Sequence, residues 1–177
     1  MKTRNLVLAL FVGLLFTTSL NAQEVKVVSM PKYLASCLYS FSRYVNWPFD
    51  YKIGDFVIAV VGDKSVYTEL QAMVNGKAVG VQPMVVKYYK SADEVTGYQH
   101  IIYLSESQSG NISKLVTRTA SKGTLMVTEK EGMLKSGAAI DFVNVDGLMK
   151  FEMSKGNFDK YGLQVSSLLE KMAYNSN

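Results

Sequence analysis

The residues of this chain that could carry nucleophilic chemistry are serines and lysines in three short groups. Ser29 and Lys32 have the spacing S-x-x-K, and residues 109–111 (Ser-Gly-Asn) and 135–137 (Lys-Ser-Gly) follow later in the chain. In serine acyl-transfer enzymes with such a set, the serine is the nucleophile and the lysine helps to activate it. Each group has only a few fixed residues, however, and the chain is short for the two-part fold of those enzymes. An exported acyl-transfer enzyme is therefore the least favoured of three hypotheses.

Other reactive side chains occur singly. His100, the only histidine, begins an apolar segment, and no carboxylate or cysteine lies near it at the spacing of metal ligands. Cys37, the only cysteine, falls on the apolar face of a predicted helix, where a free thiol behaves as a small hydrophobic group. The chain has no glycine-rich phosphate-binding motif. We therefore predict no catalytic residue, no metal site and no cofactor.

Two features could form a binding surface. Asp63 follows an apolar strand and precedes a helix, and ligands of open α/β sheets bind at the carboxyl ends of strands. The same aspartate can instead cap the helix, which is the favoured interpretation. Aromatic side chains are concentrated in residues 33–51, where they form either an aromatic core or an apolar groove for a ligand or partner. The candidate surface residues are Tyr44, Trp47, Pro48 and Asp63.

The N-terminus has the layout of a secretory signal peptide. Lys2 and Arg4 precede an apolar run over residues 6–16, and a polar stretch leads to Ala22, after which we expect cleavage. The run is short for a membrane-spanning helix, which needs about 20 residues, so an uncleaved anchor is the weaker alternative. Residues 1–22 are therefore predicted to be a signal peptide, and residues 23–177 a single domain.

Charge and cysteine content limit the classes of function. The whole chain has a formal net charge of +4, and the part after the predicted signal peptide carries 17 basic and 15 acidic residues with no block of like charge. A nucleic-acid-binding protein usually shows a clustered basic stripe, so we expect no nucleic-acid partner. One cysteine cannot form an internal disulfide, so the stability of the domain must come from packing.

Hydrophobic patterns predict an α/β fold. A helix is expected over residues 31–46, and apolar strands are expected over residues 55–61, 84–89, 100–104 and 124–128. Helices over about 65–74 and 111–120 separate some of these strands. Alternating strands and helices favour a mostly parallel sheet that is covered on both faces. The predicted architecture is a three-layer sandwich.

The last part of the chain has a different pattern. Asp146-Gly147 separates two apolar runs, residues 138–144 and 148–153, and an Asp-Gly pair in that position indicates an antiparallel hairpin. A final helix is expected over residues 157–174, with an apolar stripe formed by Phe158, Tyr161, Val165, Leu168 and Met172.

Ordered motifs along the chain resemble those of the YfiR family of periplasmic regulatory proteins. Seven segments are similar to segments of that family, in the same order: residues 39–48 (YSFSRYVNWP), 56–63 (FVIAVVGD), 99–104 (QHIIYL), 124–128 (TLMVT), 139–143 (AIDFV), 150–153 (KFEM) and 161–169 (YGLQVSSLL). Ser40 stands where the family has an asparagine. Some members also carry paired cysteines, so control by an internal disulfide is not available to this chain.

The resemblance implies a periplasmic α/β domain that regulates by protein contact. The best-known members of the family hold down a membrane-bound diguanylate cyclase from the periplasmic side, and some relatives are fused to sensor kinases. The leading hypothesis is therefore a periplasmic regulator that contacts an inner-membrane signalling protein. The alternative is a periplasmic module that binds a small molecule without a protein partner. A homodimer is also expected, because two-fold dimers are the commonest soluble oligomers.

Overall fold

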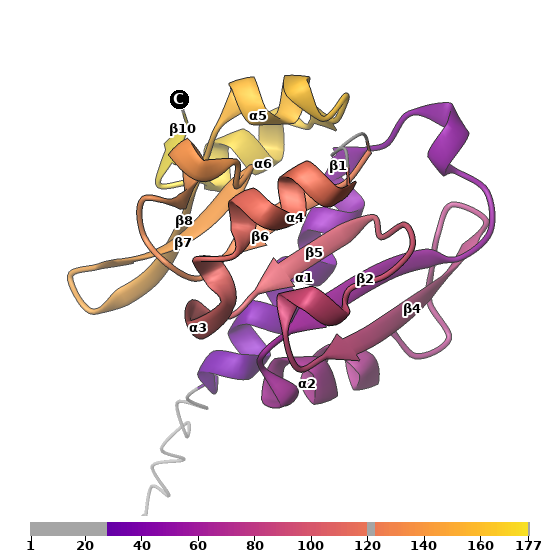
Figure 1. Ribbon diagram of the computed structural model, residues 1–177, viewed down its shortest axis with the longest axis horizontal. Coiled ribbons are helices and arrows are strands. Elements are labelled where there is room, and N and C mark those ends of the chain that lie inside the picture. Colours follow the sequence, from indigo (N-terminus) through magenta and orange to yellow (C-terminus); the bar gives the residue numbers. More distant parts are fainter. Residues whose placement is uncertain (1–27, 120–122, 177) are drawn as a thin grey trace, which may run out of the picture.

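The computed structural model of the protein describes residues 28–119 and 123–176. The predicted signal peptide, residues 1–22, lies outside the described residues. The core is built on an eight-stranded sheet with the strand order β10-β8-β7-β6-β5-β2-β4-β3 (Figure 1). Its strands are β2 (Phe56–Val61), β3 (Ala78–Val79), β4 (Gln82–Tyr89), β5 (Ile101–Leu104), β6 (Leu125–Thr128), β7 (Ile140–Val145), β8 (Leu148–Met153) and β10 (Asn175–Ser176).

The centre of the sheet is parallel and its margins are mixed. Strands β4, β2, β5, β6 and β7 run in one direction. Strand β8 is antiparallel to β7, and β3 is antiparallel to β4, whereas β10 is parallel to β8. The prediction of a mostly parallel sheet with an antiparallel hairpin near the C-terminus is confirmed.

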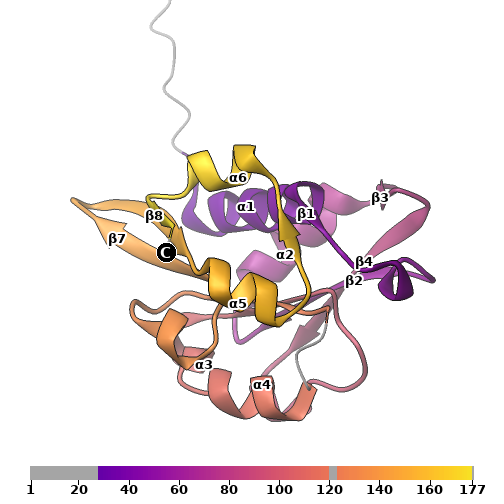
Figure 2. The ribbon, with the colours of Figure 1, turned by 90° about the horizontal axis from the view of Figure 1, so that it is seen from above.

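Helices cover both faces of the sheet. Helices α1 (Met30–Tyr44) and α2 (Lys64–Val74) pack together on one face. Helices α3 (Glu106–Ser109) and α4 (Ile112–Thr119) lie on the other face, and Figure 2 shows the sheet between the two pairs. The predicted three-layer sandwich is therefore confirmed. Two short 3-10 helices, η2 (Ala92–Glu94) and η3 (Met133–Ser136), lie in loops that connect strands.

Helix α1 follows the pattern expected from the sequence, except at its end. Pro31 lies in the first turn, where its missing N–H costs no hydrogen bond, and Leu34, Leu38 and Phe41 are buried. The helix ends at Tyr44 rather than at Asn46. The next two residues form the short strand β1 (Val45–Asn46), which pairs with β9 (Gln164–Val165) in a separate two-stranded sheet. A partner 118 residues along the chain thus replaces the last helical turn.

The hairpin was predicted correctly, and the final helix was not. Asp146 and Gly147 have φ angles of 53° and 80°, as a two-residue turn between twisted strands requires. The segment predicted as one helix over residues 157–174 divides into α5 (Lys155–Lys160), β9 and α6 (Ser167–Met172), and β10 follows it. Gly162, with a φ angle of +68°, stops α5, and the Ser166 hydroxyl accepts a hydrogen bond from the Leu169 amide and begins α6.

Splitting that segment changes which side chains reach the core. Phe158 and Tyr161 are buried, as the predicted apolar stripe required. Leu168 and Met172 are about half exposed, because α6 does not continue the phase of α5. The stripe is therefore wrong beyond the break.

Candidate functional site

A groove lies at the amino ends of β2 and β4. It has a volume of about 730 Å³ and lies between the end of α1, the loop after β1, the β3–β4 turn and β9. Figures 1 and 2 place these segments on the right, opposite the β7–β8 hairpin. We call it the amino-end groove and define it by Arg43, Tyr44, Trp47, Lys52, Val81 and Gln164.

Trp47 is the buried aromatic residue of the groove wall. Only 3 % of its surface is exposed, and its indole packs edge-on against Phe56 with ring centroids 4.8 Å apart. Its Nε1–H is buried and has no hydrogen-bond partner among the described residues. Buried indole N–H groups normally find an acceptor, so this donor is an exception that calls for an explanation.

The loop after β1 is held in place by two buried polar side chains. It contains the 3-10 helix η1 (Phe49–Tyr51). The imidazole of His100 accepts a hydrogen bond at Nδ1 from the Val57 amide, at 3.1 Å, so its Nε2 carries the proton and donates to the Tyr51 carbonyl, at 2.7 Å. The side-chain amide of Gln82 donates to the same carbonyl, at 3.1 Å. The rim of the groove is therefore anchored to the start of the sheet.

His100 is an uncharged structural residue in this arrangement. Its ring stacks on Phe56, with centroids 4.3 Å apart, and contacts Tyr98 edge-on. Burial lowers the pKa of His100 below its usual value of 6.5, although the bond to the Tyr51 carbonyl opposes the shift. Sequence reasoning placed His100 in a structural or surface role, and the fold puts it in the interior.

The polar side of the groove is cationic. The Lys52 ammonium donates to Asn46 Oδ1 at 2.8 Å, and the Asn46 side chain donates to Gln164 Oε1 at 3.2 Å. Arg43 is exposed and lies over the ring of Tyr39 rather than against a carboxylate. No carboxylate is among the residues that the structure places around the groove. The site therefore presents positive charge beside an apolar wall.

Three large apolar side chains project beside the groove into solvent. Val81 is 91 % exposed, Phe49 81 % and Ile53 77 %. Val81 lines the groove, and Phe49 and Ile53 flank Lys52 on the loop. Gln82 joins the two segments, because its side chain also donates to the Ile53 carbonyl, at 3.4 Å. We call Phe49, Ile53 and Val81 the apolar rim.

The structure separates the four residues that the sequence singled out. Tyr44 and Trp47 line the groove. Pro48 is not among the lining residues; it is half-buried and close to Gly162. Asp63 lies at the carboxyl end of β2, where its carboxylate accepts hydrogen bonds from the Ser65 and Val66 amides and caps α2.

Sequence reasoning missed the parts of the groove that come from other segments. Gly80 and Val81 form the β3–β4 turn, Gln82 begins β4, and Gln164 lies in β9, within the segment predicted as the final helix. Gly80 marks a turn in the sequence, but no local signal shows that the turn reaches Trp47. These residues could be found only with the strand order in hand.

Buried ionisable groups elsewhere have internal partners. At the carboxyl ends of the strands, the Tyr103 hydroxyl donates to Glu129 Oε2 at 2.5 Å, and burial raises the pKa of both groups. Burial also raises the pKa of the Asp141 carboxyl to about 6, although hydrogen bonds from the Met133 amide and the Thr128 hydroxyl favour its ionised form. Each of these groups therefore has a hydrogen-bond partner inside the fold.

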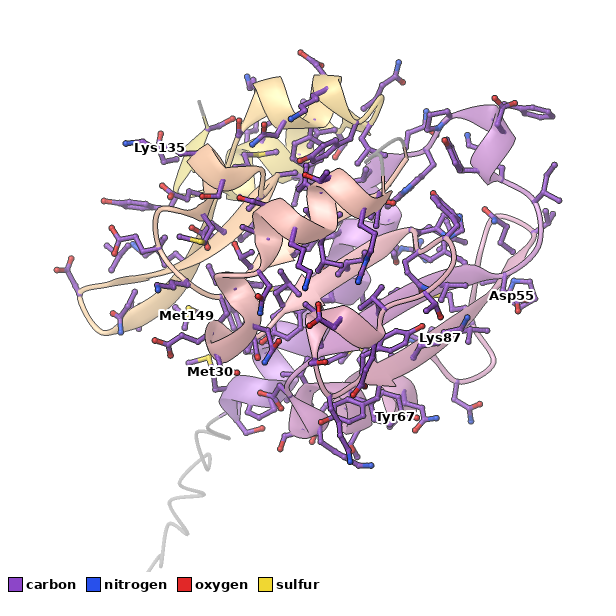
Figure 3. The ribbon with its side chains drawn as sticks, in the orientation of Figure 1. Met30, Asp55, Tyr67, Lys87, Lys135 and Met149 are labelled. Carbon is purple, nitrogen blue, oxygen red and sulfur yellow. The ribbon has the colours of Figure 1, made fainter. Side chains whose placement is uncertain are left out.

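The residues that drew attention for reactive chemistry are not assembled into a site. Burial raises the pKa of Cys37 to about 11, which leaves the thiol protonated at neutral pH. Ser109 is buried and donates to the Leu104 and Ser105 carbonyls. Figure 3 shows Met30, next to Ser29, at the lower left and Lys135 apart from it at the upper left. In residues 28–119 and 123–176 no three histidine, cysteine or carboxylate side chains gather as metal ligands.

No helix in the described part of the chain is both long and apolar enough to span a bilayer.

Comparisons with known proteins agree with the fold. A crystal structure of a conserved domain protein from Vibrio cholerae O1 biovar El Tor str. N16961 superposes with a TM-score of 0.53 at 9 % sequence identity. The match covers 85 % of this chain but only 61 % of that one, so the chain spans less than two thirds of the other protein's length. At this identity the likeness concerns the fold alone.

Sequence comparison is more specific. The search of curated proteins gives no match. The model of the YfiR/HmsC-like family, in contrast, matches residues 31–174, from the first turn of α1 to the residue before β10. This match extends over nearly all of the described fold, including every segment that forms the groove. The chain therefore belongs to the YfiR/HmsC-like family.

Proposed function

We propose that this chain is a periplasmic regulatory protein that controls an inner-membrane signalling protein, a diguanylate cyclase or a sensor kinase, by direct contact. The observation that carries the proposal is membership of the YfiR/HmsC-like family over residues 31–174. The sequence of residues 1–22, which has the layout of a secretory signal peptide, supports export.

The geometry supports contact with a protein. Phe49, Ile53 and Val81 expose apolar surface beside one groove, and they lie on two segments that Gln82 ties together. Exposed apolar groups that gather at one place on a protein surface mark interaction sites. A regulator that acts by contact needs such a surface, and this one is held rigidly by the sheet.

The test is crosslinking in living cells. The full chain with a C-terminal tag is crosslinked, purified from the membrane fraction, and its covalent partners are identified by mass spectrometry. We expect one inner-membrane cyclase or sensor kinase, and we expect deletion of the gene to change that protein's output. Recovery of this chain alone, with every membrane signalling output unchanged by deletion, would refute the proposal.

A second function, binding of a small molecule without a protein partner, is favoured by one observation. The amino-end groove has the volume of a small-molecule site, about 730 Å³, and its wall holds the unpartnered Trp47 Nε1–H. A ligand that binds only the folded state raises the melting temperature. A compound library that yields no such increase, and no change in the fluorescence of Trp47, would argue against this function.

A further inference from the structure

We infer that the amino-end groove and the apolar rim together dock a short acidic segment of the membrane partner, in which carboxylates lie beside apolar side chains. The inference rests on the proposed function for the existence of a membrane partner. It adds the surface that is used and the chemistry that the surface recognises. Four features of the site support it: its charge, an unpartnered donor, the exposed rim and the rigidity of the loop.

Charge at the groove calls for an acidic occupant. Arg43 and Lys52 reach the groove, and no carboxylate lines it. The ion pairs between described side chains, Lys114 with Asp93 and Lys155 with Glu170, involve neither of these cations. The acceptor that the structure gives Lys52 is a neutral amide oxygen, Asn46 Oδ1, so the ammonium keeps its full charge and further donors. A carboxylate entering the groove would meet two cations that have no competing ion pair.

The buried Trp47 indole supplies a donor that folding leaves unused. Its Nε1–H is sealed from solvent and has no acceptor among the described residues. A buried donor without an acceptor costs roughly 1–3 kcal/mol, and an occupant that displaces the covering atoms of the groove wall and provides an acceptor recovers that cost on binding. A carboxylate or a peptide carbonyl can do so, whereas a purely apolar occupant cannot.

The rim favours a protein segment over a small molecule. Phe49 and Ile53 are not among the lining residues, and Val81 at the edge of the groove is 91 % exposed, so a ligand confined to the groove would leave most of the apolar rim in water. A peptide segment that enters the groove beside Trp47 and continues over Phe49, Ile53 and Val81 would cover both the groove and the apolar rim. Anchoring apolar side chains surrounded by contacts that exclude water are the usual source of binding energy in protein interfaces.

Rigidity of the loop makes this surface ready to bind. His100 and Gln82 hold the Tyr51 carbonyl from inside the fold, and Lys52 is tied to Asn46 on the surface. The Tyr51 ring also stacks on Tyr98, with centroids 4.7 Å apart. A preformed site loses little conformational entropy on association, so the rim residues need not reorder when the partner arrives.

The first test places a photo-crosslinking phenylalanine analogue at single positions of the full chain in cells. Val81, at the rim, is compared with Leu148, which is 64 % exposed at the tip of the β7–β8 hairpin on the opposite side of the molecule (Figure 1). We expect the Val81 analogue to capture an inner-membrane protein and the Leu148 analogue not to. The crosslinked peptide of that protein should carry an aspartate or glutamate next to the attachment point.

Charge reversal provides the matched control. Arg43→Glu with Lys52→Glu should lower capture at Val81 at least about tenfold, which corresponds to about 1.4 kcal/mol. Lys130→Glu with Lys135→Glu makes the same change in net charge at two residues that do not line the groove, and should leave capture unchanged; Figure 3 shows Lys135 on the left. Melting temperature and Trp47 fluorescence confirm that each variant is folded.

The outcomes separate the two proposals. If the Leu148 analogue captures the membrane partner and the Val81 analogue does not, or if both charge reversals act alike, the docking site is wrong while the proposed function stands. If the wild-type chain co-purifies with no inner-membrane protein, the proposed function fails, and the docking chemistry is decided by peptide binding alone.

Peptide binding is measured on the indole of Trp47. The chain has one tryptophan, so a single indole N–H signal in a proton–nitrogen NMR spectrum reports on the groove. An acetylated pentapeptide that alternates leucine with glutamate should shift this signal, and peptides with glutamine or lysine in place of glutamate should not. If only a free carboxylate such as phenylacetate shifts the signal, the groove is a small-molecule site and the inference is overturned.

Discussion

Replacing His100 by leucine removes a buried ring that joins the rim of the groove to the start of β5. The Val57 amide donates to His100 Nδ1, and His100 Nε2 donates to the Tyr51 carbonyl. The regular ladder between β2 and β5 begins one residue later, at Ile58 paired with Ile101, so the imidazole supplies an acceptor at the end of the ladder. In the leucine variant the Val57 amide has no side-chain acceptor.

The expected loss of stability follows from these two hydrogen bonds. A buried donor left without an acceptor costs roughly 1–3 kcal/mol, and loss of an ordinary hydrogen bond costs about 0.5–1.5 kcal/mol. The Tyr51 carbonyl still accepts a hydrogen bond from the Gln82 side chain, so it is not left without a donor. Together these costs predict that His100→Leu lowers the free energy of unfolding by about 1.5–4.5 kcal/mol at neutral pH.

The effect should depend on pH in a defined direction. The folded-state pKa of His100 is lowered from 6.5, so the unfolded chain binds the proton more readily than the folded protein. The stability that neutral His100 contributes is therefore complete above pH 6.5 and is lost as the pH falls through the folded-state pKa. The leucine variant lacks this loss. The difference between the two proteins should shrink between about pH 8 and about pH 5.

The assay is urea unfolding of the purified chain, followed by the fluorescence of Trp47 and by far-ultraviolet circular dichroism. Ile101→Val, at the adjacent buried position, is the control. It should lower the free energy of unfolding by about 0.5–1.5 kcal/mol, by the same amount at about pH 8 and at about pH 5. A His100→Leu cost that is below about 0.5 kcal/mol, or that is equal at the two pH values, would refute the hydrogen-bonded, uncharged imidazole described above.

Three further substitutions test other parts of the structure. Asp63→Ala removes the cap of α2 and should lower stability by about 1 kcal/mol in thermal unfolding, while photo-crosslinking through Val81 stays unchanged; loss of capture would place Asp63 in the docking site. Gly62→Ala puts a Cβ against Ser105 Oγ at a φ angle of +85°, so urea unfolding should show a loss of more than about 1 kcal/mol, and a neutral result would contradict the close approach. Asp141→Asn removes a carboxyl whose pKa is raised from 3.8 to about 6, a group whose contribution to stability is lost as the pH rises through about 6. The free energy of unfolding of Asp141→Asn, relative to that of the wild type, should therefore rise by up to about 3 kcal/mol between about pH 4 and about pH 7. If the two proteins show the same change of stability with pH, the raised pKa is ruled out.

The predicted fold followed from patterns that each act over a short range. The apolar run of β2 is buried along nearly its whole length, as a central parallel strand requires, and α2 follows it directly. Asp146 and Gly147 supply the positive φ angles of the hairpin turn, which few other residue pairs adopt. In both places the backbone geometry is dictated by residues next to one another, so the sequence was sufficient.

The broken C-terminal helix shows where local patterns fail. Apolar residues recur at helical spacing across Gly162, so the periodicity alone predicts continuous helix. Glycine inside a helix costs only about 1 kcal/mol, and pairing of β9 with β1, more than a hundred residues earlier, decides the outcome. The pairing of β1 with β9 cannot be predicted from the hydrophobic periodicity of either segment, because the two strands are far apart in the sequence.

By itself the sequence determined the family, the three-layer architecture and two residues of the groove, Tyr44 and Trp47. Tertiary structure decided that these residues meet Val81 and Gln164, that Asp63 lies at the other end of the sheet, and that the Trp47 Nε1–H has no partner among the described residues. The physical reason is that hydrophobic periodicity records which face of an element is buried, whereas a groove depends on which distant elements become neighbours. Only the order of the strands settles that.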